Sequence, residues 1–232
     1  MAKVLPLIQP LSLYRYRSLN TDEQLARELS AIENNYLWCS NFECLNDPME
    51  GAYEASLLLE KDPGYESIKK YIFEKKLALG ICSFSETNDN DLMWAHYADQ
   101  FKGICIAYSF EDLLTTLGPN IDFVRLTYSE KIHRIYRKHT SDDDVAKRIL
   151  STKSHRWLYE REWRLFSSKT GPLPLRARKC ISYVYIGNRM TKDRKKTLMR
   201  LLDAKKIRYK IMAIDGYSIR FEATKLLRLK VK

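Results

Sequence analysis

The sequence predicts an α+β fold: a single domain over residues 1–232 in which a mixed, mostly antiparallel sheet is flanked by helices. Short segments in which apolar and polar residues alternate recur along the chain, and this period of two is typical of half-buried strands. Helical patterns come at irregular intervals, so the regular strand–helix alternation of a parallel α/β fold is missing. The sequence contains no Gly-x-Gly-x-x-Gly motif, repeat or linker, which excludes a Rossmann fingerprint and favours one domain.

The first half of the chain begins with a strand and a helix. Residues 11–18 alternate and predict a strand whose arginines share one face and whose tyrosines share the other. Thr21 or Asp22 can cap a helix over residues 22–33, and Asn46-Asp47-Pro48 predicts a turn. Further strands are expected over residues 36–40, 78–84 and 104–110, and further helices over residues 65–75, 92–99 and 111–117.

Strand patterns continue through the second half of the chain. We expect strands over residues 124–128, 157–165, 181–186, 209–214 and 218–222, a loop over residues 169–179, and a basic amphipathic helix over residues 191–204.

Residues 157–165 carry the most informative pattern, Trp-Leu-Tyr-Glu-Arg-Glu-Trp-Arg-Leu. In a single strand, Glu160, Glu162 and Arg164 would share one face, with the two carboxylates roughly 6–7 Å apart. One interpretation is a half-exposed, solvated ladder of ion pairs that adds little to stability. The other is a rigid strand that holds two carboxylates in a cleft, with Glu162 as the central residue.

The charge is distributed unevenly and indicates an anionic partner. The net charge is +11, and residues 161–232 hold 21 Lys and Arg against 5 Asp and Glu. Such a segment fits a nucleotide, a nucleic acid or an acidic protein target, although basic surfaces also serve solubility. Five cysteines without Cys-x-x-Cys spacing predict reduced thiols and a cytoplasmic protein, and no apolar run is long enough to span a membrane.

Three pairs of polar residues on predicted strands suggest binding and catalysis. An arginine can hold a phosphate, serines can hydrogen-bond a sugar, and a carboxylate can stabilise positive charge at an anomeric carbon. The pairs are Arg15 and Arg17 (with Tyr16 between them), Ser83 and Ser85, and Glu160 and Glu162.

Two further motifs each allow a structural and a functional interpretation. Trp94, His96 and Tyr97 can stack on a base or nicotinamide and supply a hydrogen bond, or they can form a buried aromatic plug. Asn46-Asp47-Pro48 with Glu50 can line a pocket or bind a metal, or it can be a structural turn. The histidines and cysteines show no metal-ligand spacing, so the sequence predicts no metal.

Six separated motifs resemble, in order, those of the bacterial family DUF2971, a domain of unknown function. The resemblance covers about residues 11–214. The motifs are Tyr14-Arg15-Tyr16-Arg17-Ser18, Asn46-Asp47-Pro48-Met49-Glu50, Cys82-Ser83-Phe84-Ser85-Glu86, Met93-Trp94-Ala95-His96-Tyr97-Ala98, Gly103-Ile104 and Tyr159-Glu160-Arg161-Glu162-Trp163-Arg164.

The order Arg, Ser-x-Ser, Glu-x-Glu is also similar to the layout of ADP-ribosyltransferases, which cleave NAD at the nicotinamide–ribose bond. This resemblance implies a split sheet and NAD as substrate. Arg15 or Arg17 would meet the NAD phosphates or ribose, and Ser83 and Ser85 would support the nicotinamide side. Glu162 would be the catalytic carboxylate and Glu160 would orient the acceptor. The middle motif departs from the family pattern, being Ser-Phe-Ser rather than Ser-Thr-Ser.

The leading hypothesis is therefore an intracellular, NAD-using, ADP-ribosyltransferase-like enzyme that modifies a nucleic acid or protein, as a toxin or antiphage effector does. One alternative is a non-enzymatic nucleic-acid-binding module, in which the basic third contacts phosphates and Trp94 and Tyr97 stack on bases. The other is a nuclease with Glu50, Glu160 and Glu162 around Mg²⁺.

Overall fold

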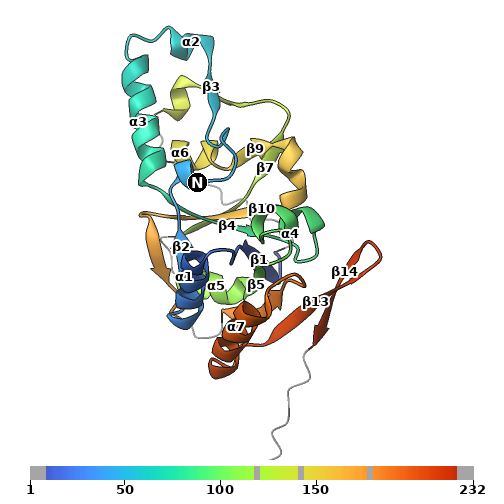
Figure 1. Ribbon diagram of the computed structural model, residues 1–232. Coiled ribbons are helices and arrows are strands. Elements are labelled where there is room, and N and C mark those ends of the chain that lie inside the picture. The colour runs from blue at the N-terminus through green and yellow to red at the C-terminus, as the bar shows by residue number, and fades with distance from the viewer. Residues whose placement is uncertain (1–8, 118–120, 141–143, 177–179, 224–232) are drawn as a thin grey trace, which may run out of the picture. The chain divides into compact units, whose positions relative to one another are not determined.

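The computed structural model describes residues 9–117, 121–140, 144–176 and 180–223 (Figure 1). The chain forms two compact units that interleave along the sequence. Unit 1 takes residues 1–35, 86–116 and 176–232, and unit 2 takes residues 36–85 and 117–175. Each unit combines helices with strands, and the predicted α+β class is confirmed; the expectation of a single domain stays a prediction.

The sheet of unit 1 is mixed and mostly antiparallel. Its strands follow the order β14-β13-β12-β5-β1, and among these pairs β12–β13 is parallel while the others are antiparallel. The β13–β14 hairpin extends away from the rest of this unit (Figure 1). The strands are β1 (Ser12–Arg17), β5 (Ile104–Ser109), β12 (Ile181–Ile186), β13 (Tyr209–Asp215) and β14 (Ser218–Ala223).

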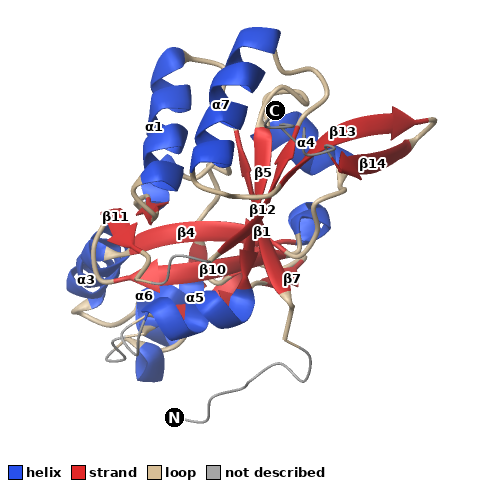
Figure 2. Cartoon of the chain, turned by 90° about the horizontal axis from the view of Figure 1, so that it is seen from below, coloured by secondary structure: helices blue, strands red, loops and turns tan. Residues whose placement is uncertain are grey.

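The helices of unit 1 are α1 (Asp22–Glu33), α4 (Asp91–Tyr97), α5 (Phe110–Leu117, ending at the unit boundary) and α7 (Lys192–Ala204). Thr21 caps α1 with a complete capping box. Helices α1 and α7 lie side by side (Figure 2), and Lys205 Nζ donates to the Glu33 carbonyl at 2.9 Å. The guanidinium of Arg17 on β1 pairs with Glu28 of α1, so α1 lies against the arginine-bearing face of this strand.

The sheet of unit 2 is antiparallel, with the order β4-β10-β6. Three small two-stranded pairs accompany it: β2–β11 is antiparallel, and β3–β8 and β7–β9 are parallel. The strands are β2 (Tyr36–Cys39), β3 (Tyr53–Ala55), β4 (Gly80–Ser85), β6 (Asp122–Arg125), β7 (Thr127–Ser129), β8 (His133–Ile135), β9 (Thr152–Ser154), β10 (Glu162–Ser167) and β11 (Gly171–Pro174).

Short helices and two apolar clusters complete unit 2. The helices are α2 (Leu57–Glu60), α3 (Tyr65–Ala78) and α6 (Val145–Ile149), with 3-10 helices η1 (Phe42–Cys44), η2 (Arg137–His139) and η3 (His155–Glu160). One apolar cluster includes Ile72 of α3 and Ile149 of α6. The other joins Ile81 of β4, Phe166 of β10 and Leu150, and it continues the face of the sheet that carries the polar site.

The predicted strand over residues 157–165 is wrong in its first half. Residues up to Glu160 form η3, Arg161 adopts a left-handed conformation (φ 45°, ψ 52°), and the strand begins at Glu162. The expected contrast between a buried and a solvent-facing side is absent as well: Leu158 is 59% exposed, whereas Glu160 and Glu162 are buried, as are Trp163 and Leu165. Strand β10 is buried on both faces, because ion pairs accommodate its charged face while apolar side chains pack on the other.

Two other predicted segments are also corrected. The strand expected over residues 124–128 breaks at Leu126, whose amide donates to the Glu162 carbonyl at 3.0 Å, and this break separates β6 from β7. The loop expected over residues 169–179 contains β11. The strands at 53–55, 133–135 and 152–154 were not expected, because three-residue pairs give almost no periodic signal.

The five cysteines all lie in described segments, and none of them is in a disulfide bond. Cys39, Cys82, Cys105 and Cys180 are buried, whereas Cys44 is exposed. Within the described ranges, no helix combines the length and the apolar character needed to cross a membrane.

Candidate functional site

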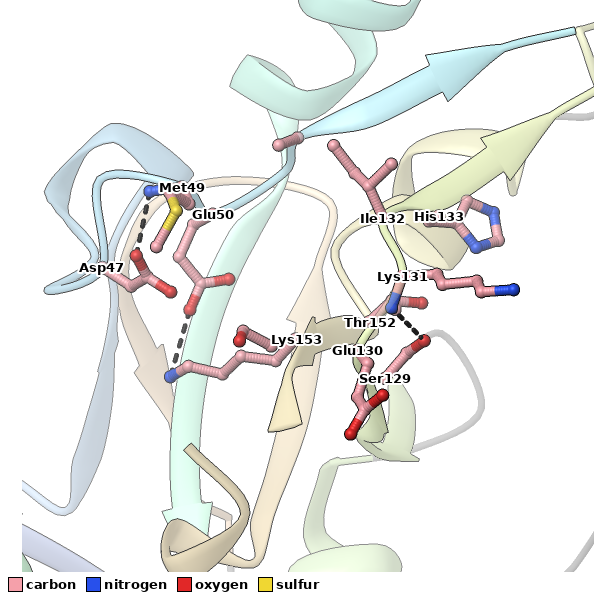
Figure 3. A pocket seen from close by; sticks show the side chains of 12 residues that line it. Asp47, Met49, Glu50, Ser129, Glu130, Lys131, Ile132, His133, Thr152 and Lys153 are labelled. Carbon is pink, nitrogen blue, oxygen red and sulfur yellow. Dashed lines mark hydrogen bonds and ion pairs between the residues drawn. The ribbon is translucent and has the colours of Figure 1, made fainter. Parts of the chain in front are cut away.

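A pocket of about 340 Å³ opens in unit 2. Figure 3 shows Asp47, Glu50 and Lys153 on one side of it and residues 129–133 on the other. The exposed side chains of Met49 and Ile132 also line it. The lining residues are Asp47, Met49, Glu50, Ala52, Ser129, Glu130, Lys131, Ile132, His133, Thr152, Lys153 and Ser154.

The turn at residues 46–50 places Glu50 at the pocket. The buried Asp47 accepts two hydrogen bonds: its carboxylate from the Met49 amide at 2.9 Å, and its backbone carbonyl from the Glu50 amide at 3.0 Å. An aspartate commonly closes a turn in this way, by bonding the backbone two residues on. The motif is therefore a structural turn, as one interpretation had it, and Asp47 and Glu50 also line the pocket.

Lys76 of α3 fixes the other end of this turn. Its buried ammonium donates to the Gly51 carbonyl at 3.1 Å and lies 4.7–5.9 Å from the ring centres of Phe42, Tyr53 and Phe73. Burial lowers the pKa of Lys76. Gly51 has φ +73°, and a Cβ there would lie 3.2 Å from the Leu150 side chain, so a glycine is required at this crowded position.

A buried network of five charged side chains lies behind the pocket. Every guanidinium N–H of Arg164 has an acceptor: two go to Glu162, two to Glu50 and one to the Leu150 carbonyl, at 2.6–3.2 Å. Lys153 Nζ lies 2.7 Å from Glu160, 3.2 Å from Glu162 and 3.2 Å from Glu50. The five side chains are only 1–6% exposed.

Neighbouring strands and loops hold the two carboxylates of the Glu-x-Glu motif. Ser85 Oγ donates to the Glu160 carbonyl at 2.7 Å, and the Glu162 amide donates to Tyr128 Oη at 2.7 Å. Ser83 hydrogen-bonds the Glu162 carboxylate. In the β4–β10 register Ser85 is opposite Glu162, and opposed residues of antiparallel strands project to the same face. The serine strand therefore supports the carboxylate directly.

The network carries a formal charge of −1, because three carboxylates face two cations. Burial raises the pKa of Glu162, but the charges of Arg164 and Lys153, with hydrogen bonds from Arg164 and Ser83, outweigh it and lower the pKa to about 2. Burial lowers the pKa of Lys153, yet the surrounding carboxylates raise it above its usual range. Glu162 therefore stays ionised at neutral pH and cannot serve as a proton acceptor there.

His133 is a pocket residue of a different kind. Burial, together with the positive charges of His139 and Arg148, lowers the pKa of His133 below its usual value. Its imidazole is therefore neutral near pH 7. The pocket accordingly offers a neutral ring, an ammonium and carboxylates to a ligand.

The structure brings four of the predicted site residues together in unit 2. Glu160 and Glu162 share Lys153 as a partner, and Ser83 and Ser85 bond Glu162 and Glu160 respectively. All four are at least half-buried, so the interpretation of Glu-x-Glu as a solvated ladder is wrong.

The N-terminal arginines and Tyr16 belong to unit 1. Arg17 is paired with Glu28 of α1, and burial lowers the pKa of Arg17. Arg15 on the same face is buried at 8% exposure. Tyr16 Oη donates to the Thr87 carbonyl at 2.9 Å, and its ring meets Trp94 edge to face. Their assignment to a phosphate or ribose stays a prediction.

The aromatic motif is mostly part of the core of unit 1. Trp94 is completely buried, its Nε1 donates to the Asn88 carbonyl at 2.8 Å, and its ring packs against Tyr16, Phe101 and Phe221. In this structure the Trp94 ring has no face open to a base, and the expected stacking by Trp94 is corrected to a packing role. His96 is exposed and Tyr97 half-buried, at the end of α4.

Sequence reasoning missed Lys153 and the pairing role of Arg164. Lysine is rarely buried, and the surrounding Ser-Thr-Lys-Ser has no periodic pattern, so nothing local marks Lys153. Glu50 was weighed only for a pocket or a metal. Asn-Asp-Pro followed by Glu was the available signal, because a rigid turn is a means of presenting a carboxylate.

The arrangement is not a preformed metal centre. Among the described residues, no group of three or more His, Cys, Asp or Glu side chains is placed to hold a metal ion. The three glutamates do converge, but the Lys153 ammonium lies within 3.2 Å of each of them. This ammonium neutralises the carboxylates from within the chain.

Residues 93–165 match the model of a family described as Protein of unknown function (DUF2971). The match confirms the family resemblance and contains the motifs around Trp94, Gly103 and Glu162. The motifs at residues 14–18, 46–50 and 82–86 lie outside the matched segment. No curated protein and no solved structure matches the chain. The family has no assigned activity, so the chemistry has to come from the site itself.

Proposed function

We propose that this protein, whose residues 93–165 match the DUF2971 family model, is an NAD-using enzyme of the ADP-ribosyltransferase kind whose substrate pocket is the one in unit 2. The observation that carries the proposal is the inner wall of that pocket. Glu50 and Lys153 line it, and both belong to a buried network with an excess negative charge. Such a wall suits a reaction in which positive charge develops on a sugar.

The proposed step breaks the bond between the ribose C1′ and the nicotinamide nitrogen. The bonding electron pair leaves with neutral nicotinamide, and an acceptor oxygen or nitrogen forms the new bond to C1′ and releases its proton. The ribose becomes positively charged on the way, and fixed carboxylates in a water-poor site stabilise that charge without reorganising. The excess charge of the network supplies this field.

The roles of the carboxylates differ from those that the resemblance implied. Glu50 lines the pocket and would contact the ribose in this proposal, whereas Glu162 lies behind the pocket with its pKa lowered to about 2. In this proposal Glu162 acts through its negative charge and through Arg164, whose guanidinium donates hydrogen bonds to the carboxylates of both Glu162 and Glu50. Lys153 positions Glu50, because its ammonium lies 3.2 Å from that carboxylate.

Nicotinamide release from NAD by the full-length chain tests the proposal. We expect Glu50→Gln to lower the rate about a hundredfold, because fixed electrostatic groups contribute on that order. Glu54→Gln is the matched control, since Glu54 is exposed and pairs with Arg134 on the outside of the same unit. Absence of release by the wild type, or an unchanged rate in Glu50→Gln, contradicts the proposal.

A nuclease is the second candidate, and one observation favours it: Glu50, Glu160 and Glu162 converge as that hypothesis requires. Mg²⁺ would have to displace the Lys153 ammonium to reach all three carboxylates. The two activities separate in one experiment, because strand cleavage should need Mg²⁺ and stop with EDTA, whereas nicotinamide release should be insensitive to EDTA.

A further inference from the structure

One tyrosine of unit 1 lies beneath two cations. Arg208 Cζ lies 4.2 Å, and Lys210 Nζ 5.1 Å, from the centre of the Tyr183 ring. Tyr183 and Lys210 are half-buried, and Arg208 is exposed. A cation is attracted to the negative face of an aromatic ring, so the ring holds the guanidinium in place at the surface. An ordered guanidinium is itself a flat, charged surface.

The sheet register places a second tyrosine on the same face. Tyr183 of β12 is opposite Ala107 of β5, and Ala107 is opposite Tyr14 of β1. Opposed residues of antiparallel strands project to one side, so the two half-buried rings flank a small alanine. Both rings therefore lie on one face of the sheet, on either side of the buried Ala107.

The other end of this face is closed by aromatic packing. Tyr16 and Tyr185 are buried, and Phe221 lies 4.5 Å from Tyr185 and 6.2 Å from Trp94, centre to centre. Tyr14 and Tyr183 are thus the more exposed rings of a larger aromatic cluster. Both pack against the buried Tyr185, whose ring centre lies 6.2 Å from that of Tyr14 and 6.1 Å from that of Tyr183.

The surrounding segment is strongly basic. Residues 180–223 contain eleven Lys and Arg against four Asp and Glu, an excess of seven positive charges. On α7, Lys192, Lys196 and Arg200 are exposed. The net charge of this segment attracts a polyanion to unit 1, and Arg208 and Lys210 are the cations that lie at Tyr183 itself.

We propose that Tyr183, Arg208 and Lys210 form a binding site for single-stranded nucleic acid. A base stacks on the guanidinium and the rings, and the backbone phosphates meet Lys210 and the neighbouring cations. Single strands are favoured because their bases can be turned out onto a protein surface, whereas duplex bases are already stacked. An acidic protein would satisfy the cations but would leave the rings unused.

This site belongs to unit 1, so its test does not depend on whether the pocket in unit 2 binds NAD. Its test is a binding measurement without NAD: fluorescence anisotropy of a short labelled oligouridylate titrated with the full-length chain. We expect Tyr183→Leu to weaken binding about tenfold, the effect of losing one stacked base, and Tyr183→Phe to bind like the wild type. The Leu and Phe variants differ in the ring and share the loss of the hydroxyl.

The double variant Arg208→Met with Lys210→Met should weaken binding further and reduce its salt dependence. Its matched control is Lys69→Met with Lys70→Met on α3, which removes the same charge from exposed positions of unit 2. Thermal unfolding of each variant verifies that it is folded; should the double variant not fold, the two Tyr183 variants decide the question.

Three results overturn the proposal. The first is that the Lys69/Lys70 control weakens oligonucleotide binding as much as the Arg208/Lys210 variant, because net charge alone would then explain the loss. The second is undiminished binding by Tyr183→Leu, or no binding by the wild type. The third is that polyglutamate, or a duplex of equal length, displaces the labelled oligouridylate as effectively as an unlabelled single strand does. Neither competitor offers free bases to the rings.

Discussion

At the scale of single residues, the balance of charge in the buried network decides which side chain matters most. Lys153→Met leaves three buried carboxylates with one guanidinium, and we expect a loss of about 3–5 kcal/mol in the free energy of unfolding, as for other broken buried ion pairs. Glu160→Gln leaves two carboxylates with two cations and should cost less. Urea unfolding of both variants measures the difference, and an equal or larger loss in Glu160→Gln would contradict this description of the network.

The same network predicts how stability depends on pH. The pKa of Glu162 is lowered from 4.5 to about 2 on folding, so its stabilisation is complete above pH 4.5 and is lost as the pH falls toward 2. The lowered pKa corresponds to a contribution on the order of 3 kcal/mol. Glu162→Gln should therefore flatten the acid side of the stability curve.

Glu54→Gln is the control for that experiment, because its exposed ion pair with Arg134 contributes little. Unfolding by urea at several pH values between 7 and 2 gives both curves. A Glu162→Gln curve that stays parallel to the wild type through the acid range would show that the Glu162 carboxylate is not held by Arg164 and Lys153.

At the scale of elements, Arg161 marks where η3 ends and β10 begins. Its left-handed conformation costs a non-glycine residue about 1–2 kcal/mol, and a β-branched residue more. We therefore expect Arg161→Gly to be at least as stable as the wild type and Arg161→Val to be less stable. If residues 157–165 formed one continuous strand, Arg161→Val would be the more stable variant, since strands favour valine and disfavour glycine. Thermal unfolding of the two variants therefore distinguishes the observed break at Arg161 from a continuous strand.

Lys76 on α3 holds the turn that presents Glu50. Lys76→Met keeps an apolar side chain among the three rings but removes the donor to the Gly51 carbonyl. We expect the amides of Glu50 and Ala52, which bond within this turn, to exchange with solvent about fivefold faster, as the loss of one hydrogen bond implies. Lys70→Met, on the exposed side of the same helix, should leave them unchanged.

At the scale of the whole molecule, the sequence predicted the fold class and most long elements, because their apolar periods extend over several residues. Helix α1 and strands β1, β5 and β12 lie close to their expected ranges. The interleaving of the two units could not be predicted from the sequence, because it depends on contacts between segments that are far apart along the chain.

The candidate site could be predicted only in part. Ser-x-Ser and Glu-x-Glu were found because both motifs are local, and β4 and β10 pair as neighbours. Lys153, on a short strand, and Glu50, in a turn, complete the site. No local sequence pattern predicts that a lysine is buried or that Glu50 pairs with Arg164. Segment 157–165 was misread because its glutamates and Arg164 are buried together with Trp163 and Leu165, so burial does not alternate along it.

Methyl NMR of the six methionines shows whether the pocket of unit 2 binds NAD. Met49 lines the pocket and is 61% exposed, whereas Met93, Met190 and Met212 are buried and serve as internal references. If NAD binds in this pocket, we expect a saturable shift of the Met49 methyl signal while the three reference signals stay in place. A Met49 signal that does not move at any NAD concentration would contradict the proposal that NAD binds there.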